Sequence, residues 1–142
     1  MKGAKHVAHL TGRNNTQALL IDWDSRGLLS FTAGVEYKNG GLIVPLNGLY
    51  FVYSNVDFQQ QSCENTLLRH QVLRRLLLYP NYRVLMESMK KNSCEKSSRW
   101  AQSSYLGAVY NLTKSDALYV HVSNVALVNF EGSKTYFGLY KL

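Results

Sequence analysis

The sequence predicts an all-β protein, a two-sheet antiparallel sandwich of the jelly-roll type. Three runs rich in Tyr, Phe and Val are typical of strands, at residues 48–53, 105–110 and 136–140. These runs do not alternate apolar with polar residues: in the first, Tyr50 and Val52 share one face. Phe51 and Tyr53 then occupy the other face, and few helical stretches exist to cover it. We therefore expect the inner sheet to pack on its own core with one face and on another copy of the chain with the other.

Length and composition fit one domain over residues 1–142. A chain of 142 residues can bury about 68–70% of its unfolded surface. Its 46% hydrophobic and 12% aromatic content excludes a disordered tail. No apolar stretch approaches the roughly 20 residues that a bilayer requires. Residues 1–4 are too short and polar for a signal peptide, and we expect them to be an added start or a stalk remnant.

Many short strands separated by turn residues support the sandwich. Turn signals such as Asn39-Gly40-Gly41, Asn47-Gly48 and Tyr79-Pro80-Asn81 divide them. The expected strands span residues 7–10, 18–23, 28–32, 35–37, 42–44, 49–58, 83–89, 104–112, 118–122, 126–130 and 135–142.

The segment 67–78 is ambiguous. Its apolar positions 68, 72, 73, 76 and 77 fit a helical stripe better than strict alternation, which slightly favours a helix. A strand that departs from alternation remains the alternative in a chain otherwise full of strands.

The chain is basic, with a formal charge of +7. Its basic residues gather in the middle of the sequence, at Arg69, Arg74, Arg75, Arg83, Lys90, Lys91, Lys96 and Arg99. An acidic partner is one interpretation, and a solvated rim is the other. No recognition-helix pattern or zinc-finger spacing supports nucleic-acid binding.

The two cysteines, Cys63 and Cys94, lie in polar stretches that resemble loops, which favours a disulfide or a metal site over buried thiols. A bridge between them would close a loop of about 32 residues and contribute roughly 3–4 kcal/mol. Two free thiols are the alternative. A disulfide indicates an oxidising compartment, and the N-glycosylation sequons at Asn14 and Asn111 agree with that.

Nothing in the sequence indicates an enzyme or a cofactor. It has no G-x-S-x-G elbow, phosphate-binding glycine loop or H-E-x-x-H motif. Asp22 and Asp24 fit a solvated strand end better than an acid–base pair. The four histidines are expected to be hydrogen-bonded structural residues and not metal ligands.

Several of these runs resemble the tumour necrosis factor homology domain, and the resemblance covers nearly the whole chain. The runs that carry it are residues 7–10 (VAHL), 48–54 (GLYFVYS), 105–110 (YLGAVY) and 136–142 (YFGLYKL). The resemblance implies a homotrimer. It also implies that the central segment is a strand leading into the loop at Tyr79, and that Cys63 and Cys94 form a disulfide without metal. The residues implied at the trimer interface are Phe51, Tyr53, Tyr105, Gly107, Tyr136, Gly138 and Leu142.

Members of this family bind the cysteine-rich ectodomains of their receptors in the grooves between subunits, and receptor clustering triggers a signal such as apoptosis. The implied receptor contacts are Tyr79 and Pro80, with Arg26 and the turn of Asn129, Phe130 and Glu131 as weaker candidates. The resemblance implies the ectodomain of a type II membrane protein, also released in soluble form, whose membrane segment lies upstream. A non-signalling lectin-like or complement-like head is the alternative. The nine acidic residues are too scattered for the calcium site of a lectin.

Overall fold

The computed structural model describes residues 5–13, 21–60, 66–91 and 100–142. In these residues the chain forms eleven strands and one short 3-10 helix. The elements are β1 (Val7–Arg13), β2 (Asp22–Asp24), β3 (Phe31–Ala33), β4 (Glu36–Lys38), β5 (Gly41–Ile43), β6 (Gly48–Gln60), β7 (Leu67–Arg75), β8 (Arg83–Lys91), β9 (Trp100–Leu112), β10 (Ala117–Val122), η1 (Val125–Leu127) and β11 (Tyr136–Lys141). The described residues contain no helix of the length and hydropathy that a membrane crossing needs.

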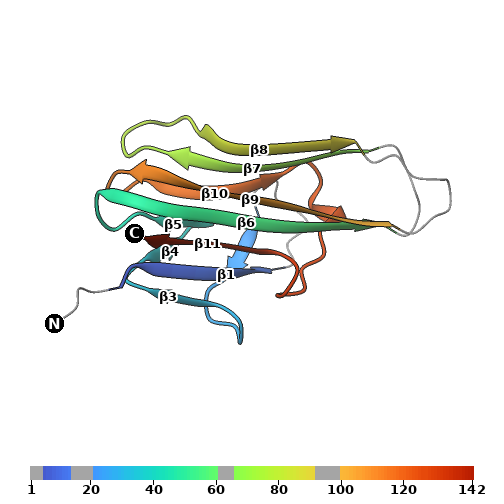
Figure 1. Ribbon diagram of the computed structural model, residues 1–142, viewed down its shortest axis with the longest axis horizontal. Helices are drawn as coiled ribbons and strands as arrows, with labels where there is room; N and C mark the ends of the chain where they lie inside the picture. Colours follow the sequence, from blue (N-terminus) through green and yellow to red (C-terminus); the bar gives the residue numbers. More distant parts are fainter. Residues whose placement is uncertain (1–4, 14–20, 61–65, 92–99) are drawn as a thin grey trace.

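The strands form two antiparallel sheets, which confirms the predicted jelly-roll sandwich (Figure 1). One sheet has the order β2-β1-β11-β6-β9, with β3 also paired to β1. The other has the order β4-β5-β10-β7-β8. The first and last strands, β1 and β11, are neighbours within the first sheet. The loop between β7 and β8 lies at the left-hand end of Figure 1, and η1 lies toward the right-hand end.

The core lies between the two sheets. Tyr50 and Val52 of β6 are fully buried there, whereas Phe51 and Tyr53, on the opposite face of the same strand, are only partly buried. The indole of Trp23 packs 5.5 Å from the ring of Phe137. The other large buried side chains are Phe58, Leu10, Ile21, Leu42, Leu112, Leu118 and Leu139. The two-sided character predicted for β6 is therefore confirmed.

Most expected strands are present with ends shifted by a few residues, but the strand expected at 126–130 is wrong. Residues Val125–Leu127 form η1, and Val128 makes only an isolated bridge with Phe58. The reason is a cap: the side chain of Asn124 accepts a hydrogen bond from the Ala126 amide at 3.1 Å. The strand expected at 28–32 begins later than predicted, because β3 spans Phe31–Ala33. Residues 18–20 of the expected second strand lie outside the described residues.

The helical preference for 67–78 is also wrong, because β7 is a strand with inward-facing Leu68, His70 and Val72. Two residues break the alternation of apolar and polar residues that a strand with one buried face would show. His70 is polar but points inward, and Leu73 is apolar but points outward, where Ala117, Tyr119 and Ile43 cover it. A register shift opposite Leu73 adds a bulge to the pairing with β8.

The buried His70 links the two sheets by hydrogen bonds. Its Nε2 lies 3.0 Å from Ser54 Oγ, and its Nδ1 lies 2.9 Å from Ser104 Oγ. Ser54 Oγ donates to the Tyr136 carbonyl, so it accepts from Nε2–H, and this assigns a neutral ring whose Nδ1 accepts from Ser104. Burial lowers the pKa of His70 to about 4. His70 is the satisfied structural histidine that was expected, whereas Nδ1 of His121 is buried without a partner among the described residues.

The lowered pKa of His70 predicts that the protein loses stability as the pH falls from about 6.5 toward 4. Above the unfolded-state pKa of about 6.5 the ring is neutral in both states, and its contribution to stability is complete. Below that pH the unfolded chain binds a proton that the folded chain excludes. The free energy of unfolding should then fall by up to about 1.4 kcal/mol per pH unit, or about 3 kcal/mol in all.

Urea unfolding at pH 7, 6 and 5 measures this loss. The matched control is His70→Gln, whose amide can bond both serines but does not titrate. The decline with pH should be shallower in the variant than in the parent. Equal declines would show that His70 is not the responsible group.

Candidate functional site

The outer face of the first sheet carries a continuous set of aromatic side chains. Residues directly opposite each other in an antiparallel pair point to the same side. Tyr53 lies opposite Gly107 and Gly138, and Phe51 lies opposite Val109 and Tyr140. Extending the register to β1 and β3 adds further side chains. We call this surface the aromatic face; its rings are those of His9, Phe31, Phe51, Tyr53, Tyr105, Tyr136 and Tyr140.

The rings of the aromatic face pack on one another across strands. The His9 ring centroid lies 5.3 Å from that of Tyr136 and 5.8 Å from that of Tyr53. The Phe51 centroid lies 5.5 Å from that of Tyr140 and 6.0 Å from that of Tyr53. These separations are those of favourable stacked and tilted pairs. The face is therefore preorganised within one protomer.

Two glycines make room for these rings. A Cβ on Gly138 would lie 2.5 Å from both Tyr53 Cζ and the backbone oxygen of Ala8. A Cβ on Gly107 would lie 3.0 Å from Phe51 Cζ and 2.9 Å from the Tyr105 hydroxyl. The absence of side chains at these positions lets the rings of Tyr53, Phe51 and Tyr105 approach the backbone of the two glycines.

The aromatic face is uncharged at neutral pH. Burial lowers the pKa of His9, and its Nδ1 lies 2.7 Å from the Tyr53 hydroxyl. Burial is also the main reason that the pKa of Tyr53 rises to about 12, with Tyr105, Tyr136 and Tyr140 adding to it. A neutral face loses little hydration energy when another apolar surface covers it.

Much of this face is open in the single chain. The side chain of Tyr105 is 55% exposed, and Leu49, Val109, Tyr140 and Leu142 are also exposed on the same side of the sheet. A contiguous apolar surface of this kind marks an interaction site. The structure therefore brings together all seven residues that the resemblance implies at the trimer interface.

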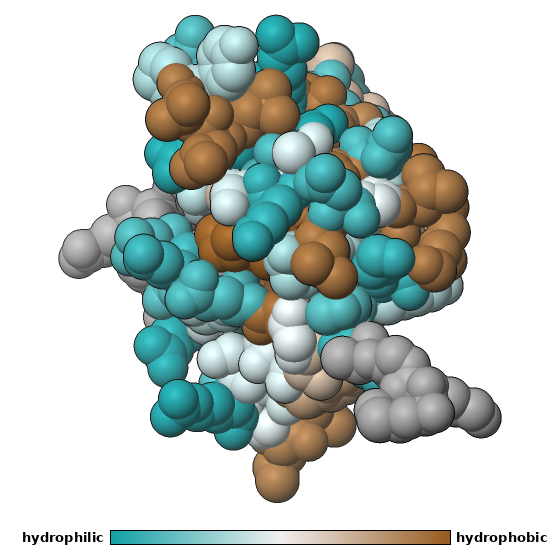
Figure 2. Space-filling view, turned by 90° about the vertical axis from the view of Figure 1, so that its left-hand side faces the viewer, coloured by the Kyte–Doolittle hydropathy of each residue, from teal (hydrophilic) through white to brown (hydrophobic). Residues whose placement is uncertain are grey.

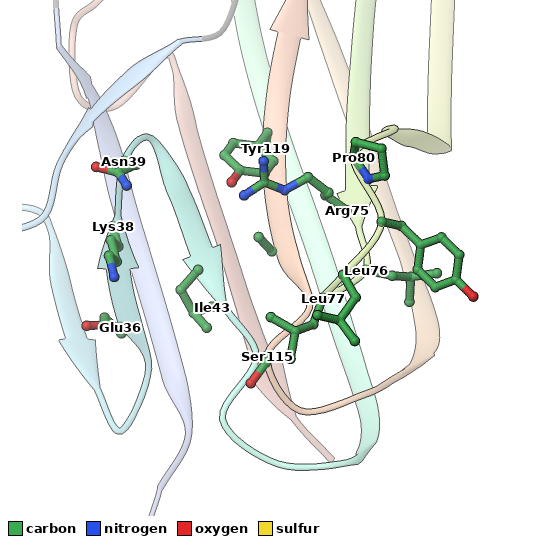
Figure 3. Close-up of a pocket in the computed structure, with 13 residues that line it drawn as sticks. Glu36, Lys38, Asn39, Ile43, Arg75, Leu76, Leu77, Pro80, Ser115 and Tyr119 are labelled. Atoms are coloured by element: carbon green, nitrogen blue, oxygen red, sulfur yellow. The ribbon is translucent and has the colours of Figure 1, made fainter.

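The second candidate surface is the loop between β7 and β8, which carries Tyr79 and Pro80. Both residues are exposed, and the Tyr79 amide donates to the Leu76 carbonyl at 3.1 Å. A pocket of about 570 Å³ separates this loop from the β4–β5 hairpin; Figure 3 shows Lys38 and Asn39 on one side and Leu77 and Pro80 on the other. In Figure 2, which looks onto this end of the molecule, apolar side chains gather near the top, over the β7–β8 loop.

The weaker receptor candidates lie away from Tyr79. Arg26 is exposed in the β2–β3 loop, and its amide donates to Asp24 Oδ1 at 2.9 Å. That loop approaches the turn after η1, because Leu29 Cδ1 lies next to Gly132.

Of the three candidate residues in this turn, Asn129, Phe130 and Glu131, only Glu131 is exposed. Asn129 Nδ2 donates to Asp57 at 3.3 Å, and the ring of Phe130 packs on Gly12. One protomer therefore does not join Arg26 and the Asn129–Glu131 turn to the Tyr79 loop.

The basic residues have diverse environments. Arg74 forms a salt bridge with the buried Asp116 at 2.6 Å, and the Arg75 guanidinium lies 5.9 Å from the ring centres of both Tyr82 and Tyr119. Lys90 donates to the Ser103 carbonyl at 3.2 Å. Lys96 and Arg99 lie outside the described residues.

The described ranges contain no group of three or more His, Cys, Asp or Glu side chains placed to hold a metal.

The remaining predicted sites are only partly described. Cys63, Cys94 and Asn14 lie outside the described residues, so their disulfide and glycosylation stay predictions. Asn111 is exposed in β9, opposite Leu49, at the margin of the aromatic face.

Sequence reasoning missed several members of the aromatic face. Tyr140 and Val109 could have been found, because each lies two residues beyond a glycine already assigned to that face. His9 and Phe31 could not, because only the pairing of β1 with β3 and β11 places them there.

Comparison with known proteins agrees with this architecture. Residues 21–142 match the model of the TNF (Tumour Necrosis Factor) family, and the chain belongs to that family. It is 51% identical over 138 residues to Tumor necrosis factor ligand superfamily member 6 of Felis catus, covering 97% of this chain and 49% of the relative. The human protein of that name is 50% identical over 141 residues, covering 99% and 50% respectively. The chain thus spans about half the length of these relatives.

A more distant relative is Tumor necrosis factor of Marmota monax. It is 36% identical over 148 residues, covering 97% of this chain and 63% of the relative.

The packing at Gly138 predicts that Gly138→Ala destabilises the protomer. The added methyl would collide with a backbone oxygen that cannot rotate away, and overpacking of this kind costs about 3 kcal/mol at its upper end. Urea unfolding at a fixed protein concentration measures the loss. The control is Gly132→Ala, whose nearest neighbour is a Leu29 methyl at 3.3 Å that can shift. Equal stability of the two variants would contradict the close packing of Tyr53 on Gly138.

Proposed function

We propose that the chain assembles as a homotrimer through the aromatic face, with Phe51, Tyr53, Tyr105, Tyr136 and the two glycines near the three-fold axis. Two features support this proposal. The face is apolar, neutral and open in the protomer, and its sheet is already covered by the second sheet on the other side. Leu142 follows β11, and its amide donates to the Leu49 carbonyl, which extends the face to the C-terminal residue.

We further propose that the trimer is a cytokine ligand that clusters a Fas-like death receptor and so triggers apoptosis. The observation that carries this proposal is about 50% identity, over nearly the whole chain, to proteins named Tumor necrosis factor ligand superfamily member 6. The partner is the cysteine-rich ectodomain of a receptor of the tumour necrosis factor receptor class. The mechanism is geometric: a trimer offers three equivalent grooves, and binding gathers three receptors with no bond made or broken.

Tyr79 and Pro80 are proposed as the main receptor contacts. A tyrosine at an exposed loop tip offers a rigid apolar ring with a polar end, which is typical of binding hot spots. Because Arg26 and the Asn129–Glu131 turn lie elsewhere on the protomer, they can belong to the same receptor site only if adjacent subunits supply different parts of it.

The compartment follows from the same proposal. The chain would act outside the cell, as the ectodomain of a type II membrane protein or as its shed form. A disulfide between Cys63 and Cys94 and glycans on Asn14 and Asn111 suit that compartment. No catalytic step and no cofactor belong to the proposed mechanism.

The trimer proposal predicts that Tyr105→Ala weakens assembly and spares the protomer. Tyr105 is more than half exposed in the single chain, so its truncation removes little from the protomer core. In a trimer it would be buried, and its loss should cost about 3 kcal/mol per site, as for core truncations. Light scattering at micromolar concentration should show dissociation of Tyr105→Ala, whereas Val84→Ala, an exposed change on the other sheet, should leave the mass unaltered. Equal masses for the two variants would exclude Tyr105 from the interface.

The receptor proposal predicts that Tyr79→Ala weakens binding by about 2 kcal/mol, or roughly 30-fold. The variant should keep the parent's assembly state, because a loop tip contributes little to the aromatic face. Surface plasmon resonance against the purified Fas ectodomain, with sizing of both proteins, separates lost contact from lost assembly.

Two outcomes of this measurement would count against the proposal. Unchanged affinity of the variant would remove Tyr79 from the site. Failure of the parent to bind the ectodomain, or to activate caspases in receptor-bearing cells when cross-linked, would reject the Fas-like assignment.

A further inference from the structure

Leu78 combines two properties that a leucine rarely has. Its backbone lies in the left-handed region, with φ at +75°, and its side chain is 93% exposed. An L-residue with a Cβ is strained in this region, which glycine occupies freely. The fold would accept glycine at this position at less cost, so neither backbone geometry nor packing explains a leucine there.

The other non-glycine residues with positive φ in the described part of the chain also lie in tight turns, but they are small or polar. Asn39, with φ at +50°, precedes Gly40 in the two-residue turn of the β4–β5 hairpin, where Asn-Gly is the favoured pair. Ser115, with φ at +76°, is the third residue of a turn that the Asp116 amide closes by donating to the Thr113 carbonyl at 3.0 Å. Leu78 has the same position in the turn that the Tyr79 amide closes to the Leu76 carbonyl at 3.1 Å. The turn explains the positive φ of Leu78, but not an exposed apolar side chain where glycine or asparagine is favoured, and a leucine at such a position points to a function of its side chain.

The residues beside Leu78 form an exposed apolar loop tip, and two arginines lie at the base of the loop. Leu77 and Tyr79 beside it are each 62% exposed, and the Leu76–Tyr79 hydrogen bond closes the turn. Arg75 and Arg83, at the two ends of the loop, are exposed, and neither forms an ion pair with a described residue. Figure 3 shows Arg75 extending beside Tyr119 in the adjoining pocket.

We propose that Leu78 is a specificity-determining contact of the receptor site, whose side chain enters an apolar depression on the receptor ectodomain. This inference rests on the proposed function and extends it beyond Tyr79. The rim of the depression would carry carboxylates that face Arg75 and Arg83. An ectodomain with basic residues at that place would repel the guanidinium groups of Arg75 and Arg83. An ectodomain without the depression would clash with the Leu78 side chain, and either would therefore bind weakly.

A protein pocket suits this tip better than a lipid surface. A fixed, strained conformation improves affinity by lowering the ordering cost of a shape-specific contact. Insertion into fluid lipid gains little from such preorganisation. Membrane binding is therefore treated as a competing outcome of the test.

The test compares Leu78→Gly and Leu78→Asn with the parent. Both residues tolerate positive φ, so each variant should keep the fold and raise Tm, by about 3 °C for glycine. Each should nevertheless bind the purified Fas ectodomain about tenfold more weakly in surface plasmon resonance.

The two substitutions distinguish loss of the apolar side chain from loss of backbone restraint. Both remove the apolar side chain, but glycine also loosens the loop, whereas asparagine restrains the backbone more. The matched control is Leu67→Asn, an exposed leucine at the other end of β7, which should bind as the parent does.

Several results would overturn the inference. If the parent binds and both Leu78 variants bind within twofold of it, Leu78 is not a contact, and the proposed function stands. If only the glycine variant is weakened, loop rigidity matters and the side chain does not. If vesicles of phosphatidylserine and phosphatidylcholine bind the parent but not the variants while receptor affinity is unchanged, the tip is a lipid contact. If the parent does not bind the ectodomain, the proposed function fails and takes this inference with it.

Discussion

The structure depends on one constraint, which is that the central strands of the first sheet are apolar on both faces. Tyr50 and Val52 face the second sheet and are fully buried, while Phe51 and Tyr53 face away from it. The second sheet can cover only one side. The other side carries neutral aromatic rings. These rings lie close to the backbone, because Gly107 and Gly138 have no side chains there. Such a surface is suited to burial against another apolar surface, and the proposed trimer would supply it from further copies of the chain.

The aromatic face and the β7–β8 loop differ in how well their residues fit the conformation of the protomer. At the aromatic face, sequence and packing agree: glycines, rings and a neutral histidine all favour the same close arrangement. At the β7–β8 loop they disagree, because Leu78 is held in a conformation that disfavours leucine and gains no burial in return. Disagreement of this kind is expected where a residue is retained for a contact outside the protomer.

Much of the fold could be predicted from the sequence, because turn residues and β-rich runs mark the strands locally. The failures have physical causes. His70 is a polar residue inside the core, and Leu73 is an apolar residue outside it. The apolar residues of β7 therefore follow the spacing of a helix and not that of a strand. Asn124 capped a helical turn where Val and Leu suggested a strand. The aromatic face was predictable along each strand but not across strands, since only the register brings His9 and Phe31 to it.

Sedimentation equilibrium of the unaltered protein tests the central claim, that the aromatic face is buried between copies of the chain, most directly. The protomer has a mass of 16.1 kDa. At micromolar concentration one species of three times that mass is expected. A species that remains at 16.1 kDa under the same conditions would contradict it, because the aromatic face would then be exposed to water in the stable state.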